Sequence, residues 1–102
     1  MKKILLVCGA GMSTSLLVTK MQKAAKERGV EVEITATSGE SLDKEIENVS
    51  VLLLGPQIRF KKDEFKKKYG DRFPIEVIDT MDYGMMNGEK VLEFALKIMG
   101  EK

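Results

Sequence analysis

The sequence contains no histidine and no tryptophan, and its 102 residues include one cysteine and two prolines. Without histidine the chain cannot build a Ser-His-Asp triad, a Cys-His dyad or an HExxH metal site, nor use an imidazole as acid or base. One cysteine cannot form an internal disulfide, and without histidine it cannot complete a Cys/His zinc site. Any chemistry must therefore use thiol, carboxylate, hydroxyl, amine or backbone groups, and we expect no metal and no bound cofactor.

Neither sign of charge is in excess, because 17 Lys and Arg face 16 Asp and Glu, for a formal net charge of +1. A dedicated nucleic-acid-binding protein normally carries a basic surplus, so we expect no nucleic-acid partner. No apolar run is long enough to span a membrane, and the run from Ile4 to Val7 is too short for a signal peptide. The hydrophobic fraction of 43% is enough for a buried core, which excludes intrinsic disorder and predicts one domain over residues 1–102.

Four apolar segments predict β-strands. Residues 3–7 and 51–54 are continuously apolar, which is typical of strands covered on both faces. Residues 30–36 alternate apolar and polar side chains, which indicates a half-exposed strand near a sheet edge. Residues 75–78 follow Pro74 and form the fourth expected strand.

Helical patterns alternate with these strands, over the stretch from the first loop to Arg28 and over residues 42–46, 61–69 and 87–99. The order βαβαβαβα with right-handed crossovers predicts an α/β fold, with a parallel sheet of order 2-1-3-4 and helices on both faces. Such sheets bind ligands at the carboxyl ends of their strands. We therefore expect the loops at residues 8–13, 55–57 and 79–86 to converge on one site.

The loop after the first expected strand carries the chemistry; with the residues that follow it reads Cys8-Gly9-Ala10-Gly11-Met12-Ser13-Thr14-Ser15. Its glycines allow backbone amides to turn inward, and its three hydroxyl residues are candidate donors and helix N-caps. Inward amides at a helix N-terminus suit a phosphate, and the same positive end favours a thiolate. Cys8 is thus a candidate nucleophile toward phosphorus. The competing interpretation is an inert, buried cysteine in a phosphate-binding or partner-binding module without catalysis.

The loop lacks the lysine of GxxxxGK[ST] and the third glycine of GxGxxG, which disfavours ATP and dinucleotide binding. Its spacing resembles that of cysteine phosphatases, in which Cys is followed after five residues by Arg, but Thr14 stands at the arginine position. Without a guanidinium fork, hydrolysis is disfavoured and a phosphocysteine should persist until an acceptor arrives. A small phosphatase-like hydrolase remains the enzymatic alternative.

Three segments together carry a more specific resemblance: residues 8–18, Leu54-Gly55-Pro56-Gln57, and Glu76-Val77-Ile78-Asp79 with Tyr83-Gly84. The whole chain resembles the enzyme IIB component of the bacterial sugar phosphotransferase system (PTS), of the lactose/cellobiose/chitobiose type. The resemblance implies that Cys8 accepts a phosphoryl group from a phosphohistidine of enzyme IIA and donates it to a sugar held by the membrane enzyme IIC. It also implies a phosphate-binding loop over residues 9–15 and a cytoplasmic protein that docks on the membrane through IIC. Since one face would serve two partners, we expect a monomer.

The remaining candidates lie on the other two loops. Gln57 could hydrogen-bond a phosphoryl oxygen or the loop backbone, or be an ordinary turn amide. A carboxylate beside a phosphoryl group repels it, so Asp79 and Asp82 are as well suited to capping or solvent exposure as to the site rim. Tyr83 is a candidate for the same rim, with plain packing as the alternative. The lysine-rich stretch over residues 61–68 is typical of a solvated helix face.

Overall fold

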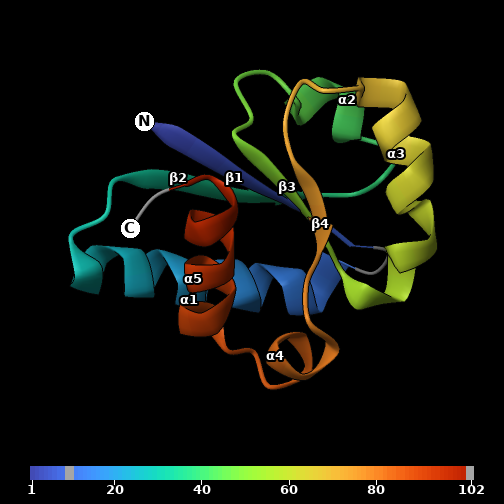
Figure 1. Cartoon of the computed structure of the whole chain (residues 1–102). Coiled ribbons are helices and arrows are strands. Elements are labelled where there is room, and N and C mark those ends of the chain that lie inside the picture. The colour runs from blue at the N-terminus through green and yellow to red at the C-terminus, as the bar shows by residue number, and fades with distance from the viewer. Residues whose placement is uncertain (9–10, 101–102) are drawn as a thin grey trace.

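The computed structural model describes residues 1–8 and 11–100, and for residues 11–13 it describes the backbone alone. Over these residues a parallel sheet has the order β2-β1-β3-β4. The strands are β1 (Lys2–Val7), β2 (Val32–Thr37), β3 (Val51–Leu54) and β4 (Ile75–Val77). The predicted strand order is confirmed, and so is the convergence of the strands' carboxyl ends on one edge (Figure 1).

Burial follows the patterns in the sequence. All four residues of β3 and the last four of β1 are buried, as expected for central strands. In β2 the Ile34 side chain is buried while Glu33 and Ala36 are exposed, which is the half-covered pattern of an edge strand.

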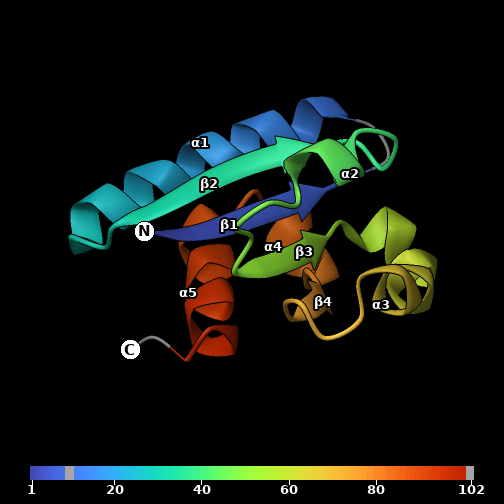
Figure 2. The ribbon, with the colours of Figure 1, turned by 90° about the horizontal axis from the view of Figure 1, so that it is seen from above.

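Helices cover both faces of the sheet, as predicted (Figures 1 and 2). They are α1 (Gly11–Arg28), α2 (Leu42–Glu45), α3 (Lys62–Tyr69), α4 (Thr80–Gly84) and α5 (Gly88–Ile98), with a 3₁₀ helix, η1 (Pro56–Lys61). One buried cluster joins α1, α4 and α5 to the sheet through side chains that include Ile4 and Leu6. The other cluster joins α2 and α3 to the opposite face through side chains that include Leu5 and Val7.

Three local predictions were wrong. Helix α1 begins at Gly11, so Ser13, Thr14 and Ser15 lie within its first turns and are not its N-cap. The segment 55–57, expected as a loop, opens η1 because a proline at the first helical position is pre-organised for a helical turn. The segment 79–86, also expected as a loop, contains α4, which is stabilised at its start by the side chain of Asp79.

Candidate functional site

Cys8 follows β1 directly at the carboxyl edge of the sheet. Side chains alternate along a strand, so its sulfur falls on the same face as Ile4 and Leu6, toward α1 and α5. The side chain is 2% exposed and the thiol is free. The predicted nucleophile is therefore part of the buried cluster on this face of the sheet and is not a surface thiol.

Tyr83, the last residue but one of α4, reaches this sulfur across 75 positions of sequence. Its hydroxyl donates a hydrogen bond to the Sγ of Cys8 at 3.4 Å. The Oγ1 of Thr14, in the first turn of α1, lies 3.3 Å from the same hydroxyl. Because the phenolic proton is directed at the sulfur, Thr14 is the donor in the second bond. A buried chain of hydrogen bonds thus runs from α1 through α4 to the end of β1.

The surroundings of Tyr83 in this hydrogen-bond chain keep its phenol protonated. Burial raises the pKa of Tyr83 above its ordinary value, and the hydrogen bond and charge of Cys8 raise it further, whereas hydrogen bonds from Thr14 and Gln57 oppose the rise. At neutral pH the hydroxyl of Tyr83 is therefore a proton donor to the sulfur and not a base.

Gly55, the residue after β3, gives the sulfur its space. Its N–H donates to the carbonyl oxygen of Val7 at 2.8 Å, which holds the two strand ends together. A Cβ at this position would lie 2.6 Å from the Sγ of Cys8 and 2.8 Å from the Oε1 of Gln57, which is closer than real Cβ contacts come. The φ of Gly55 is −62°, so the glycine serves close approach and not an unusual backbone conformation.

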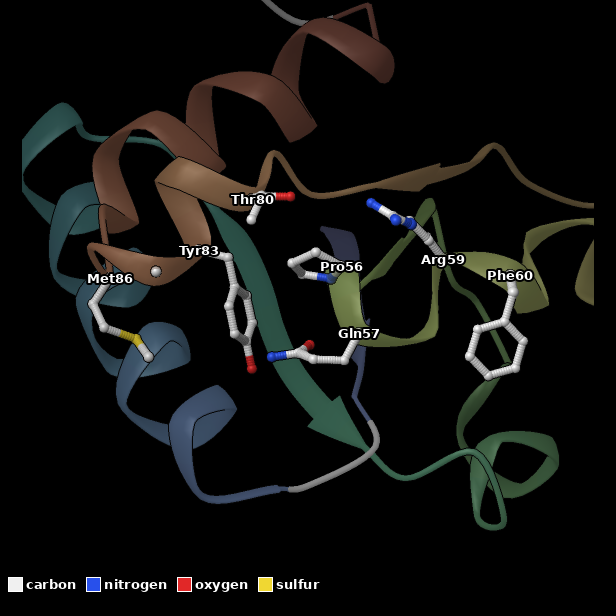
Figure 3. A pocket seen from close by; sticks show the side chains of 8 residues that line it. Pro56, Gln57, Arg59, Phe60, Thr80, Tyr83 and Met86 are labelled. Atoms are coloured by element: carbon white, nitrogen blue, oxygen red, sulfur yellow. The ribbon is translucent and has the colours of Figure 1, made fainter.

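A pocket of about 760 Å³ opens beside the Cys8–Tyr83 pair (Figure 3). In Figure 3 the Gln57 amide and the Tyr83 hydroxyl point toward one another, and Arg59 and Phe60 lie on the side of Gln57 away from Tyr83. The full lining is Pro56, Gln57, Arg59, Phe60, Thr80, Tyr83, Gly84 and Met86. Sequence reasoning did not single out Arg59 and Phe60; the signal for them was their place in the turn that continues from Gln57.

Large apolar side chains are exposed near this edge of the sheet. Phe60 of η1 is 73% exposed, and Met81 and Met85 of α4 are each 70% exposed. Leu16, in the second turn of α1, is 50% exposed. These exposed apolar side chains come from three separate elements, and one of them, Phe60, lines the pocket.

Of the predicted site residues, the structure brings together Cys8, Thr14, Gln57 and Tyr83. Gly9 and Ala10 lie outside the described residues, as do the side chains at positions 11–13, and Ser15 is exposed.

The two acidic candidates, Asp79 and Asp82, make hydrogen bonds within and just after α4. The Asp79 carboxylate accepts hydrogen bonds from the backbone N–H groups of Met81 and Asp82, both at 3.1 Å. This is the capping role considered above for Asp79. Asp82 is half-buried, and its main-chain carbonyl accepts from the N–H of Asn87 at 2.9 Å.

The lysine-rich stretch is mostly solvated, as predicted, but two of its members form ion pairs. Lys62 lies 3.0 Å from Glu76, and Lys68 lies 2.9 Å from Asp43.

Within residues 1–8 and 11–100, no cluster of three acidic or cysteine side chains is arranged to hold a metal ion. In the same part of the chain, no helix combines the length and the hydropathy that a membrane span requires.

The family model described as "PTS system, Lactose/Cellobiose specific IIB subunit" matches residues 3–94. The chain belongs to this family. IIB components are sugar phosphotransferases, so the protein is a phosphotransferase of the lactose/cellobiose type that takes part in phosphoryl transfer to sugar. The phosphotransferase resemblance seen in the sequence is confirmed.

Whole-length relatives agree with this assignment. The chain is 48% identical to the oligo-beta-mannoside-specific EIIB component of Bacillus subtilis, over 97% of both chains. It is 50% identical to the galactose-specific and 49% identical to the cellobiose-specific EIIB components of Lactococcus lactis, over 96% of each chain. The lactose-specific EIICB component of Lacticaseibacillus casei is 26% identical over 89% of this chain, which spans 16% of that longer IIB-containing protein.

Solved structures of IIB components have the same fold. The cellobiose-specific IIB component of Borrelia burgdorferi has a TM-score of 0.79 at 44% identity, covering 97% of this chain and 92% of that one. The lactose-specific IIB domain of Streptococcus pneumoniae has a TM-score of 0.84 at 20% identity, covering 95% and 96%, and at that identity it supports the fold alone.

Proposed function

We propose that this IIB component carries its phosphoryl group on the sulfur of Cys8. The donor is a phosphohistidine of enzyme IIA, and the acceptor is a sugar held by the membrane component IIC on the cytoplasmic side. The observation that carries the proposal is the placement of the chain's one thiol at the carboxyl edge of the sheet, beside the first turn of α1 and against the Tyr83 hydroxyl. No other side chain of the sequence is a comparable nucleophile, because the chain has no histidine and no second cysteine.

The two transfers balance through one S–P bond. In the first, the sulfur attacks phosphorus, the S–P bond forms and the P–N bond to the IIA histidine breaks, and the thiol proton ends on the departing imidazole. In the second, a sugar hydroxyl oxygen attacks phosphorus and the S–P bond breaks. The sulfur then leaves with the electron pair, and the hydroxyl proton is released on the acceptor side.

The phosphoryl group itself would be held by the N-terminal turn of α1 and the loop before it, residues 9–15. The first amides of an α-helix have no partner within the helix and carry the positive end of its dipole, which suits a dianion. Thr14 occupies the place where phosphatases have arginine, so the site has no guanidinium fork on the phosphoryl oxygens. This favours a carrier whose phosphocysteine persists in water over a hydrolase.

Both partners would approach through the exposed apolar side chains at the site, Leu16, Phe60, Met81 and Met85. Methionine and aromatic side chains are common at surfaces that accept more than one partner. Since the two partners would use this same surface, they bind in turn, and the protein acts as a monomer. The sugar belongs to the cellobiose/chitobiose/lactose class, and the relatives are named for oligo-beta-mannoside, galactose and cellobiose.

Intact-protein mass spectrometry tests the proposal after incubation with phosphoenolpyruvate, the general phosphotransferase proteins and IIA proteins from the same organism. We expect one added phosphoryl group on the wild type and none on Cys8→Ser. A matched control is the double variant Cys8→Ser/Glu31→Cys, which moves the single thiol to an exposed residue just before β2, at the opposite edge of the sheet, and should also gain nothing. Phosphorylation of Cys8→Ser, or no addition to the wild type with any IIA protein, would overturn the proposal.

The phosphatase alternative has a separate test. Turnover of an aryl phosphate that depends on Cys8 and runs faster than transfer to sugar would make the protein a hydrolase. We expect no turnover above that of Cys8→Ser.

A further inference from the structure

We infer that the Tyr83 hydroxyl, oriented by Thr14, is a catalytic donor that stabilises the Cys8 sulfur whenever the S–P bond is open. The inference rests on the proposed function, because it concerns the same sulfur. It assigns Tyr83 to the reacting atom itself and not to the rim of the site.

The geometry supports a donor and not a packing contact alone. The phenol oxygen lies 3.4 Å from Sγ, a normal separation for a hydrogen bond to sulfur. With the phenolic proton donated to Sγ, the phenol oxygen accepts from Thr14 at 3.3 Å, so the hydroxyl is held on both sides by side chains of the protein. Tyr83 and Thr14 are 5% and 1% exposed, so water does not compete freely for either hydroxyl.

The chemistry explains why a donor is useful at this atom. Negative charge develops on the sulfur as the S–P bond breaks, and the sulfur is neutral while that bond is intact. A hydrogen bond to the anion is stronger than one to the neutral sulfur, so Tyr83 stabilises the charge that develops as the S–P bond breaks. The phenol keeps its own proton throughout.

A phenol on the sulfur and a phosphatase arginine act on different atoms of the reacting group. A guanidinium fork acts on the phosphoryl oxygens and promotes transfer to any nucleophile, water included. A phenol on the sulfur assists departure of the leaving group but does nothing to position an attacking water. Leaving-group assistance lowers the barrier for any acceptor, so slow transfer to water would come from the missing guanidinium and not from the phenol.

The two tyrosines of the chain form a matched pair for the test. Tyr69 is also 5% exposed, and its hydroxyl donates to the carboxylate of Asp43, on the face of the sheet opposite the site. Tyr83→Phe and Tyr69→Phe each remove one largely buried hydroxyl and keep the ring. Only the first change removes a hydrogen bond from Cys8.

The measurement is single-turnover transfer from phosphorylated Cys8 to sugar in membranes that contain IIC, and back to dephosphorylated IIA. We expect Tyr83→Phe to slow both by about tenfold, the typical loss for one hydrogen bond to a charged group. Tyr69→Phe should stay within about twofold of the wild type. Equal rates in the two variants would overturn the inference.

A conservative pair at Thr14 separates catalysis from stability and serves if Tyr83→Phe folds poorly. Thr14→Val removes the donor to Tyr83 and should slow transfer, whereas Thr14→Ser keeps a hydroxyl and should restore it. Equal rates for Val and Ser would contradict the inference.

A spectroscopic signature completes the test. The chain has no tryptophan, so in the Tyr69→Phe background all intrinsic fluorescence comes from Tyr83. Phosphorylating Cys8 should change that emission, and an unchanged emission would place the phenol away from the sulfur. If wild-type Cys8 takes no phosphoryl group at all, the proposed function fails; if it does and the variants transfer normally, only this inference fails.

Discussion

Replacing Gly55 by alanine is the sharpest perturbation of the site, since it adds one methyl group directly against the reacting sulfur. The new Cβ would lie 2.6 Å from the Sγ of Cys8, whereas ordinary contacts begin at 3.4 Å, so the two atoms must separate by 0.8 Å. The Oε1 of Gln57, at 2.8 Å from the same point, sits on a flexible side chain and can move away more easily. Most of the displacement therefore falls on the sulfur or on the backbone at the end of β3.

Two consequences follow for Gly55→Ala, one for stability and one for rate. Crowding of this kind destabilises a protein by about 1–3 kcal/mol. Misplacing a reacting atom by about 1 Å slows its reaction by roughly 100-fold. A 100-fold loss of rate corresponds to about 2.7 kcal/mol, so the two effects are similar in free energy. We expect the loss of rate to be measured on protein that is still folded.

The assay combines rapid-quench phosphorylation by phosphorylated IIA with urea unfolding of the same samples. Gly84→Ala is the matched control, because Gly84 also lines the pocket but a Cβ there meets nothing within 4 Å. It should behave as wild type in both measurements. If Gly55→Ala were phosphorylated by IIA at the wild-type rate, the reasoning would be refuted, since the sulfur would then tolerate the displacement.

Three further predictions concern other parts of the molecule. Gly88→Ala places a Cβ 2.6 Å from the Lys20 main-chain carbon at the crossing of α5 and α1, so urea unfolding should show a loss of about 1–3 kcal/mol. Hydrogen bonds from Tyr69 and then from Lys68 lower the pKa of the Asp43 carboxyl in the folded protein. The carboxylate therefore stabilises the fold at pH values above its pKa in the unfolded chain, and this stabilisation is lost as the pH falls through its pKa in the folded protein. Asp43→Asn should therefore lose less stability than wild type between pH 7 and about pH 3 in the same urea assay. Phe60→Ser truncates a side chain that is 73% exposed, so the melting temperature should hold within about 2 °C while the KM for phosphorylated IIA rises severalfold.

The arrangement of the strands could be predicted from the sequence because burial leaves a direct trace in it. The continuous apolar runs that end at Val7 and Leu54 predict central strands, and the alternation around Ile34 predicts an edge. These patterns favour the order 2-1-3-4, and right-handed crossovers then place helices on both faces of the sheet. That order was enough to bring Cys8 and the segments around Gln57 and Tyr83 to the same edge.

The short helices could not be predicted in the same way. Helix α4 has five residues and η1 has six, too few for a helical repeat of apolar side chains to show. Their signals were local: an Asp79 that caps the backbone three residues later, and a proline directly after Gly55. The role of Tyr83 was hidden for a related reason, since only the turn of α4 decides whether its hydroxyl faces solvent or Cys8.

The alternation of side chains along β1 has a consequence for how this protein can change. Cys8 lies on the α1 and α5 face because it is an even number of residues from Ile4 and Leu6. Deleting or inserting a single residue within the strand would reverse that parity and send the sulfur toward α2 and α3, away from Tyr83. A change of one residue in the length of β1 would therefore abolish the chemistry of the site in a single step, without replacing any of its residues.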